Sequence, residues 1–336
     1  MSLILAPLLA CMGLSVPMLA GRGLGHTGGT IDKLESIKGF RTNLSAEEIK
    51  TAVETVGCCI TAQSSEIAPA DSLLYALRDI SDTIDSIPLI TASIISKKAA
   101  EGLERLVLDV KCGNAAFMQT KEDAVALAKS MVKTGNSLGM QVTAQVTEMD
   151  NPIGMMFGNS HEIVECIQCL KGEGPEDTME LVYAQADALG YDIRPHIEEG
   201  SALTEFRNMC IRQGVNEEDI DEIIQNPWSK LESSPNSVDI VSTSSGWITD
   251  IHALTIGEIL CKLGAGRTGE NPDINHGVGA QLLVQRGSFI EEGTAWIRFD
   301  TETGISSEMI DQVQSALTLS DSEVEISSRI LQIIEE

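Results

Sequence analysis

A cluster of glycines between residues 21 and 36 is the part of this sequence best suited to bind a ligand through its backbone. The segment reads GRGLGHTGGTIDKLES and follows a short apolar run at 16–19. Glycine loses more conformational entropy on folding than any other residue, so such a cluster indicates a sharp turn or a close approach to a ligand. A strand that leads into a glycine-rich turn presents backbone N–H groups to an anion. The alternative is an ordinary glycine-rich turn that binds nothing.

A predicted helix over 87–98 carries a serine and a lysine one turn apart. Ser93 and Lys97 are four residues apart, and this spacing places both side chains on one face of the helix. A lysine offers a point charge to a group that carries or develops negative charge. For a lysine taken alone, the alternative is an exposed charge on a helix surface.

The cysteines predict buried thiols. Cys166 and Cys169 have the spacing of a metal or redox motif, but they fall in the helical pattern EIVECIQCL, and no second CxxC accompanies them. We therefore expect both to pack in the core. Nothing in the spacing of the eight cysteines calls for disulfides, which favours a reducing compartment, the cytoplasm.

Charge and composition exclude some classes of partner. The 336 residues carry a net charge of −27, which disfavours binding to nucleic acid and attraction to anionic membranes. No apolar run is long enough to span a membrane. Phosphate would be repelled at long range, so a phosphate site needs local positive charge. Aromatic residues make up only 4%, which favours an aliphatic α/β core.

The scaffold that positions these residues is predicted from alternating helix and strand patterns. Periodicity and helix caps indicate an α/β fold with a mostly parallel sheet flanked by helices. Residues 200–236 are expected to be helical, and a small domain with both strands and helices is expected after them. The other helices are expected at 3–12, 45–56, 72–78, 120–138, 160–170 and 176–190, and the strands at 16–19, 58–62, 106–110, 141–147, 280–285 and 295–299.

Several motifs together resemble the thymidine phosphorylase and pyrimidine nucleoside phosphorylase family, from residue 2 to about residue 300. The resemblance implies reversible phosphorolysis, in which phosphate attacks the anomeric carbon of a pyrimidine nucleoside and the base leaves. For thymidine the products are thymine and 2-deoxyribose 1-phosphate. The motifs are GRGLGHTGGTIDKLES at 21–36, SIPLITASIISKK at 86–98, LDVK at 108–111, NSHE at 159–162, LGAGR at 263–267 and HGVG at 276–279.

The resemblance assigns the pyrimidine site to Arg78, Ser93 and Lys97, with Arg78 and Lys97 as the catalytic groups. A departing pyrimidine accumulates negative charge on its oxygens and ring nitrogen. Arginine offers a planar fork of donors to a carbonyl edge, and lysine offers a point charge. Stabilising the leaving anion in a closed, dry site contributes several kcal/mol. His26, inside the glycine segment, looks structural in the family.

The resemblance assigns phosphate binding to Ser2 and Thr30, and phosphate is then a co-substrate. Ala20 stands where the family commonly has a serine. The family's Lys-His-Ser-Thr-Gly-Gly type loop is not found among these 336 residues. We therefore expect very slow turnover of thymidine, or none. The alternatives are an inactive fragment or binding protein that keeps the fold, and a phosphoribosyl-transfer enzyme of related architecture, which the pyrimidine-site residues disfavour.

No cofactor is required by this reading, but some family members bind a monovalent cation. The matching positions are Ile153, Met156 and Glu165, which form half of such a site. The resemblance also implies a homodimer.

Three parts are expected from the resemblance and the change in composition. Residues 1–69 and 101–236 form the α/β phosphate-binding domain. Residues 70–100 are the remnant of a small helical lobe and carry the pyrimidine site. Residues 237–336 form a C-terminal β-rich domain.

Overall fold

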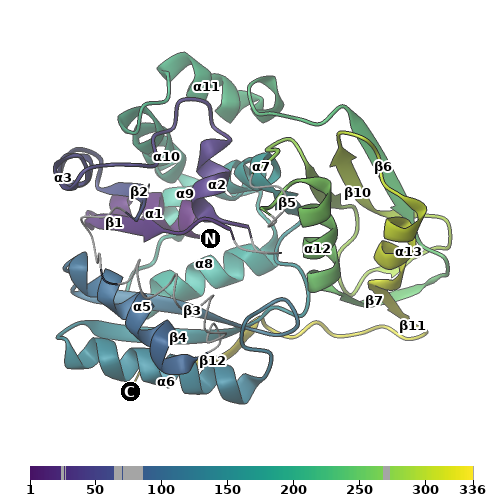
Figure 1. Ribbon diagram of the computed structural model, residues 1–336, viewed down its shortest axis with the longest axis horizontal. Coiled ribbons are helices and arrows are strands. Elements are labelled where there is room, and N and C mark those ends of the chain that lie inside the picture. The colour runs from purple at the N-terminus through teal and green to yellow at the C-terminus, as the bar shows by residue number, and fades with distance from the viewer. Residues whose placement is uncertain (24–25, 27, 64–69, 71–85, 268–272, 336) are drawn as a thin grey trace.

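A computed structural model confirms the predicted α/β class, and it describes all residues except 24–25, 27, 64–69, 71–85, 268–272 and 336 (Figure 1). Its helices are α1 (Ser2–Cys11), α2 (Thr30–Glu35), α3 (Ala46–Val56), α5 (Ile87–Ala100), α6 (Lys121–Ser137), α7 (Asn159–Leu170), α8 (Glu176–Ala188), α9 (Arg194–Glu198), α10 (Ser201–Arg212), α11 (Glu217–Gln225), the 3-10 helix η1 (Pro227–Ser229), α12 (Ala253–Leu263) and α13 (Ser307–Ser315). Its strands are β1 (Val16–Ala20), β2 (Cys58–Ala62), β3 (Arg105–Cys112), β4 (Gln141–Glu148), β5 (Met156–Gly158), β6 (Asn236–Val241), β7 (Gly246–Ile251), β8 (Gly279–Leu282), β9 (Phe289–Ile290), β10 (Ala295–Thr301), β11 (Leu317–Ser320) and β12 (Ile330–Ile334).

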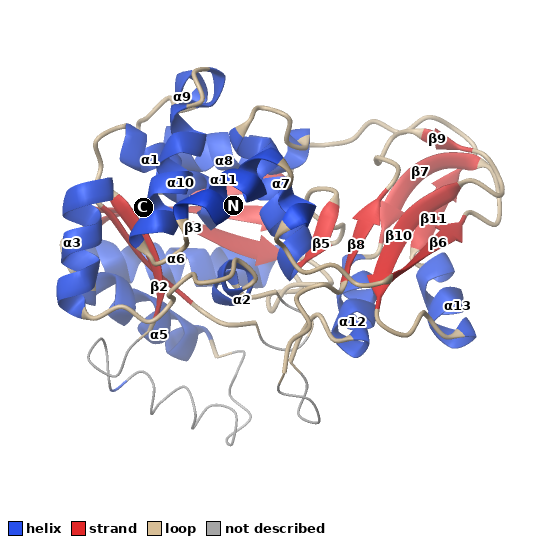
Figure 2. Cartoon of the chain, turned by 90° about the horizontal axis from the view of Figure 1, so that it is seen from above, coloured by secondary structure: helices blue, strands red, loops and turns tan. Residues whose placement is uncertain are grey.

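The first half of the chain contains two pairs of parallel strands. β1 runs parallel to β2, with Val16 opposite Cys58, and β3 runs parallel to β4, with Arg105 opposite Gln141. Among the described residues, β1 pairs only with β2, and β3 pairs with no strand but β4. Helices cover these strands, as the views in Figures 1 and 2 show. The carboxyl ends of β1 and β3 therefore each lead into a loop on which a ligand site can be built.

Local capping signals place two helices where the sequence predicts them. The Ser45 hydroxyl accepts a hydrogen bond from the Glu48 N–H at 3.3 Å, and the Glu48 carboxylate accepts from the Ser45 N–H at 2.9 Å. This is the reciprocal arrangement of a capping box. The Thr120 hydroxyl accepts from the Asp123 N–H at 3.2 Å and starts α6.

The region 200–236, which is predicted to be helical, is divided into separate helices. α10 ends at Arg212, and Gly214 then adopts φ +105°, a conformation that favours glycine. Asn216 caps the start of α11, and β6 already begins at Asn236. Helical periodicity extends through this region, but a left-handed glycine and a new cap divide it.

The end of the chain returns to the first half of the molecule. β12, inside the range 237–336, pairs antiparallel with β4, with Ile330 opposite Thr147. Figure 1 shows this yellow segment running from β11 back to β12 beside β4. β6, β8 and β10 share a sheet with β5, and β7, β9 and β11 form another. No described helix is long and apolar enough to cross a membrane.

A buried histidine joins α7 to the C-terminal sheet. The Nε2 atom of His161, a residue 2% exposed, lies 2.8 Å from Oδ2 of Asp300 on β10. Because a carboxylate only accepts, Nε2 carries the proton. Burial favours a higher pKa for Asp300, but hydrogen bonds donated by His161 and Ser237 hold that pKa below its ordinary value.

Replacing Asp300 with Asn is expected to lower the free energy of unfolding at pH 7 by about 1–3 kcal/mol, because two charge-assisted bonds are weakened. A carboxyl group whose pKa is lower in the folded state stabilises the fold above its unfolded pKa, and this stabilisation is lost as the pH falls through the folded value. The difference between wild type and variant should therefore shrink below about pH 4. Urea unfolding between pH 3 and 7 measures it, with Asp311→Asn on the exposed side of α13 as control. An undiminished difference at pH 3 would show that the charge of Asp300 is not the cause.

Candidate active site

A cavity of about 1100 Å³ lies where β1 and β3 end. Much of its wall comes from the end of β1 with the glycine segment, the face of α5, the end of β3, the loop before β5 with the start of α7, and α12. The end of β2, the loop after β3 and α6 also contribute. The residues from these regions include Leu19, Ala20, Gly21, Arg22, His26, Gly28, Lys33, Ile90, Ser93, Ile94, Lys97, Asp109, Lys111, Pro152, Ile153, Asn159, Glu162, Glu165 and Ala253.

The predicted pair on α5 faces this cavity. Lys97 Nζ donates a hydrogen bond to Ser93 Oγ at 2.9 Å, and Ser93 is 8% exposed. The one-face arrangement expected from their spacing is thereby confirmed. Ile90 and Ile94 line the cavity beside them, so α5 presents an apolar surface next to a polar pair. Such a surface suits a flat heterocycle with oxygens on its edge. Arg78 lies outside the described residues.

Within the glycine segment, Gly29 lies close to the backbone of Arg22 and Gly23. A side-chain carbon at Gly29 would lie 2.5 Å from the carbonyl carbon of Arg22 and 2.5 Å from Asp32 Oδ2, so only glycine fits. Asp32, 1% exposed, accepts hydrogen bonds from the Gly23 N–H at 2.7 Å, from Arg22 at 3.1 Å and from Arg267 at 2.7 Å. Through these hydrogen bonds, Asp32 therefore holds the glycine segment in its conformation.

His26 contacts another residue of the cavity lining. Its Nε2 atom lies 3.0 Å from the carbonyl oxygen of Ala115, which follows β3. A carbonyl can only accept, so this nitrogen donates. The bond ties the glycine segment to the loop after β3, and the structural role of His26 stays a prediction.

The two candidate phosphate residues both begin helices. Ser2 is the first residue of α1 and Thr30 is the first residue of α2. Helix N-termini carry unpaired N–H groups that favour anions. Neither residue is among those that line the cavity, whereas Ala20, Gly21 and Gly28 are. The structure thus brings the glycine backbone and the Ser93–Lys97 pair to one cavity, with Ser2 and Thr30 outside its lining.

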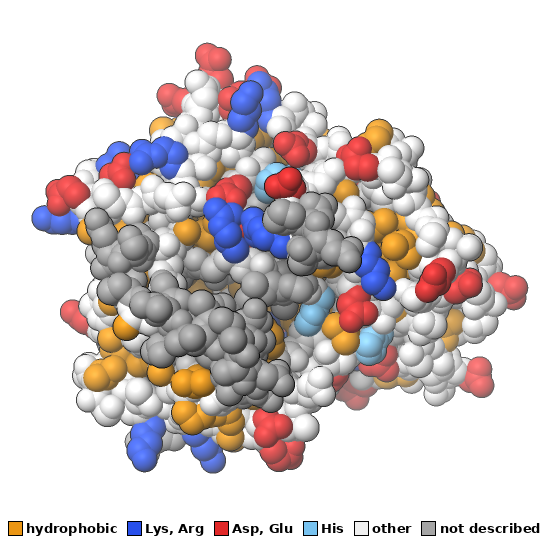
Figure 3. Space-filling model, viewed as in Figure 1, with side chains coloured by type: hydrophobic (Ala, Val, Ile, Leu, Met, Phe, Trp, Pro, Cys, Tyr) orange, Lys and Arg blue, Asp and Glu red, His pale blue; other side chains and the backbone are white. Residues whose placement is uncertain are grey.

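The charge of the cavity differs from that of the whole chain. Its described lining holds four basic residues (Arg22, Lys33, Lys97 and Lys111) and three acidic ones (Asp109, Glu162 and Glu165), against a net −27 overall. Figure 3 shows several basic side chains lying together near the centre of this face. This supplies the local positive charge that an anion needs on so acidic a protein.

Two lining residues, Lys33 and Lys111, lie within motifs of the sequence, but the sequence alone assigns them no role. Lys33 pairs with Glu162 across α2 and α7. Lys111, at the end of β3, lies 2.8 Å from Asp109 and donates to Thr147 at 3.1 Å. Burial lowers the pKa of Lys111, although Asp109 acts against this. The signal that could have identified Lys111 is its position at the carboxyl end of a parallel strand.

Glu165 occupies the position predicted for a cation ligand. Its Oε1 atom accepts from the backbone N–H groups of Met155 at 2.6 Å and Met156 at 3.1 Å. Gly154, at φ +77°, makes room for the carboxylate, because a side-chain carbon there would lie 2.8 Å from Glu165 Cδ. Burial raises the pKa of Glu165 to about 7, and the charges of Glu162 and Asp177 add to this.

This environment fits a monovalent cation. A buried carboxylate with two negative neighbours is the kind of group that a cation stabilises, and carbonyl oxygens such as those of Ile153 and Met156 are ligands of hard cations. Ile153 and Glu165 line the cavity, whereas Met156 does not. No group of three or more His, Cys, Asp or Glu residues suited to a metal occurs in the described part of the chain.

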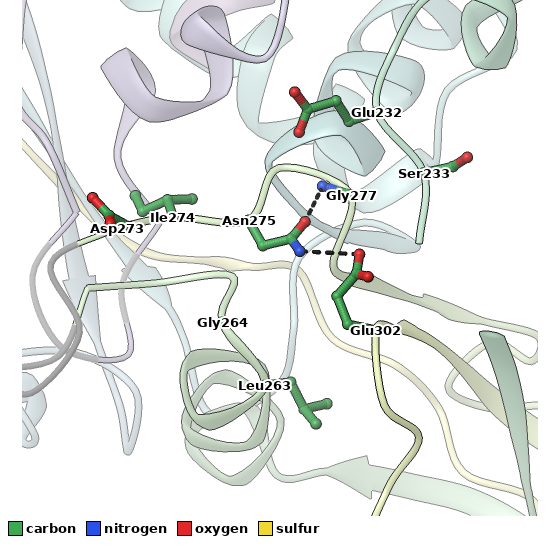
Figure 4. A pocket seen from close by; sticks show the side chains of 9 residues that line it. All are labelled: Glu232, Ser233, Leu263, Gly264, Asp273, Ile274, Asn275, Gly277 and Glu302. Atoms are coloured by element: carbon green, nitrogen blue, oxygen red, sulfur yellow. Dashed lines mark hydrogen bonds between the residues drawn. The ribbon is translucent and has the colours of Figure 1, made fainter. Parts of the chain in front are cut away.

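A second hollow, of about 560 Å³, differs in charge (Figure 4). Glu232, Asp273 and Glu302 line it, and Asn275 donates to Glu302 at 3.0 Å. Three carboxylates disfavour a phosphate ligand. The candidate anion site is therefore in the larger cavity.

The cysteines behave as predicted. All eight are free thiols, and Cys166 and Cys169 are buried within α7. Burial raises the pKa of Cys166 to about 12. Both therefore act as small apolar side chains of the core.

Two family models match the chain. The first, described as "Glycosyl transferase family, a/b domain", covers residues 1–203. The second, described as "Pyrimidine nucleoside phosphorylase C-terminal domain", covers residues 247–320. The first match alone spans more than half of the chain.

Curated relatives agree with these models. The chain is 42% identical to the thymidine phosphorylase of Rattus norvegicus over an alignment of 338 positions, which covers 95% of this chain and 71% of that protein. It is 39% identical to the pyrimidine-nucleoside phosphorylase of Staphylococcus epidermidis, over 100% of this chain and 79% of that protein. It is 37% identical to the thymidine phosphorylase of Agrobacterium fabrum, over 99% of this chain and 78% of that protein. These relatives give no support to the alternative of an inactive fragment. They confirm the resemblance seen in the motifs: the chain belongs to the thymidine phosphorylase and pyrimidine nucleoside phosphorylase family.

Proposed function

We propose that this protein catalyses the phosphorolysis of pyrimidine nucleosides, converting thymidine and phosphate to thymine and 2-deoxyribose 1-phosphate. The observation that carries the proposal is that the glycine segment and the Ser93–Lys97 pair line one cavity. The glycine segment offers backbone N–H groups to an anion, and α5 offers donors to a base.

In the proposed reaction, Lys97 and Ser93 hold the pyrimidine, and Arg78 joins them as the family pattern implies. A phosphate oxygen forms a bond to the anomeric carbon while the bond from that carbon to the ring nitrogen breaks. The bonding electrons leave with the base, which then takes a proton from solvent. Lys97 stabilises the negative charge of the departing base, so its effect is larger in the transition state than in the bound substrate.

Phosphate is proposed to bind at the glycine segment. The backbone N–H groups near Gly21 and Gly28 and the charge of Arg22 support this placement. Ser2 and Thr30 are proposed to take part as the family pattern implies. Asp32 holds Gly23 and Arg22 in place, so that the donors are set before phosphate arrives.

We propose no required cofactor and an optional monovalent cation held by Ile153, Met156 and Glu165. When bound, the cation supplies charge that offsets the buried Glu165 carboxylate. Glu165 itself fixes the N–H groups of Met155 and Met156 and so shapes the wall of the cavity.

The test is the formation of thymine from thymidine by the purified protein with and without phosphate. We expect thymine to appear only with phosphate, together with an equal amount of 2-deoxyribose 1-phosphate. Uridine in place of thymidine measures substrate preference. Release of free deoxyribose without phosphate would show hydrolysis instead. The absence of any phosphate-dependent thymine, combined with tight binding of thymidine, would favour a binding protein. The same assay gives the turnover rate.

We also propose a cytoplasmic homodimer whose parts close on the substrates. Eight free thiols support a reducing compartment. The proposed parts are the α/β domain (1–69 and 101–236), the segment 70–100 and the C-terminal domain (237–336). Closure would bring α5 towards the glycine segment. Light scattering of the purified protein gives its mass, and a monomeric mass would contradict the dimer.

A further inference from the structure

A buried arginine near the end of the chain holds the loop between β4 and β5. Arg329 precedes β12 and is 5% exposed. Its Nη1 atom donates to the carbonyl oxygen of Asn151 at 3.0 Å, and Nη2 donates to that of Pro152 at 2.5 Å. Glu148 contacts Nη1, and Asp177 lies 2.7 Å from Nη2. The guanidinium thus binds two consecutive carbonyls between two carboxylates.

The same two carboxylates bind the loop as well. Glu148 accepts from the backbone N–H of Asn151 at 2.8 Å and from its side chain at 3.0 Å. Asp177 accepts from the backbone N–H of Gly154 at 3.3 Å. Arg329 and its two partners therefore fix the loop on both sides of Ile153.

This loop forms part of the wall of the cavity. Pro152 and Ile153 line the cavity, and the N–H groups of Met155 and Met156 bind Glu165. The bonds from Arg329 end one residue before Ile153, and those to Glu165 begin two residues after it. The direction of the Ile153 carbonyl is set between these two anchors.

We propose that Arg329 is a positioning residue for the cation site formed by Ile153, Met156 and Glu165, an inference that rests on the cation site proposed above. Arginine suits this role because its planar fork donates in two directions and keeps its charge when buried. Groups outside the ligand set orient the ligands and tune metal affinity. Arg329 also lies beyond residue 320, where the second family match ends.

The test measures cation binding through thermal stability and needs no catalytic assay. The melting temperature is recorded against the concentration of KCl, with tetramethylammonium chloride at equal ionic strength as reference. A ligand that binds the folded state raises the melting temperature with a midpoint set by its affinity. For Arg329→Lys we expect the midpoint to rise at least about tenfold, as for other residues that orient metal ligands.

The matched control is Arg298→Lys. Arg298 also makes a two-pronged contact, to Asp239 at 2.7 and 3.0 Å, but on the exposed surface of β10. Its variant should keep the wild-type midpoint. A purely structural role for Arg329 would lower the melting temperature in both salts and leave the midpoint unchanged.

Three outcomes separate the proposals. Glu165→Gln should abolish the potassium-specific rise in melting temperature. If it does, and Arg329→Lys keeps the wild-type midpoint, the role proposed for Arg329 is wrong and the cation site stands. If the wild type shows no potassium-specific rise, the cation site is wrong and the role of Arg329 falls with it, while phosphorolysis is judged by its own assay. If Arg329→Lys does not fold, Glu148→Gln decides. This variant weakens the anchor of Arg329 and should raise the midpoint about threefold or more, and an unchanged midpoint would overturn the proposal.

Discussion

Replacing Lys97 with Met is expected to lower kcat/KM for thymidine phosphorolysis about 10²–10³-fold. Lys97 lines the cavity and donates to Ser93 Oγ at 2.9 Å. If it stabilises the departing pyrimidine, the loss falls on the transition state, where the base carries most negative charge. The measurement is the initial rate of thymine formation across thymidine and phosphate concentrations.

The kinetic pattern matters as much as the size of the loss. Most of it should appear in kcat, because a group that acts only on the leaving anion contributes little to substrate binding. Lys133→Met, on the exposed surface of α6, should keep wild-type kinetics. Lys97→Arg keeps the charge and should recover part of the rate, but not all of it, since the fork of an arginine differs in shape from an ammonium. A change confined to the KM for phosphate would place Lys97 at the other substrate.

The elements around the site could be predicted because their signals are local. Ser45 and Thr120 mark the starts of α3 and α6, because each caps its helix through a hydrogen bond to a residue only three positions away. The face shared by Ser93 and Lys97 follows from helix geometry alone. β1 and β2 are short runs rich in apolar residues between helices, and a parallel pair covered by helices has that pattern.

The contacts that complete the site could not be predicted, because they join distant parts of the chain. Asp32 binds Arg267 across 235 positions, and Arg329 binds Glu148 across 181. Sequence periodicity indicates which face of an element is buried, but not which residues from elsewhere in the chain contact that face. The return of β12 to β4 has the same cause: a short apolar strand at the end of the chain fits any free sheet edge equally well.

The roles of Ser2 and Thr30 show where a family pattern and a cavity differ. The pattern assigns both residues to phosphate, while the described lining contains Ala20, Gly21 and Gly28 instead. Both residues begin helices, so their backbone N–H groups can favour an anion without their side chains facing the cavity. Their assignment therefore stays a prediction, and the glycine segment is the better place to test phosphate binding.

Replacing Gly29 with Ala is expected to raise the KM for phosphate at least about tenfold, because the segment must open to admit the methyl group. A carbon there would lie 2.5 Å from the Arg22 backbone and 2.5 Å from Oδ2 of Asp32, a buried side chain held by three hydrogen-bond partners. Moving Asp32 breaks the bond to the Gly23 N–H and releases Arg22. The free energy of unfolding should fall by about 1–3 kcal/mol from overpacking.

The matched control for Gly29→Ala is Gly21→Ala, in the same segment. A carbon added at Gly21 meets nothing within 4 Å, and its backbone does not require glycine, so Gly21→Ala should change the free energy of unfolding by less than about 0.5 kcal/mol. The KM for thymidine should change little in Gly29→Ala, because Ser93 and Lys97 lie on α5, a separate element. Equal rises in both KM values would mean that the segment supports the whole cavity. A rise confined to phosphate would mean that the close approach of Gly29 to Arg22 and Gly23 holds donors for that anion.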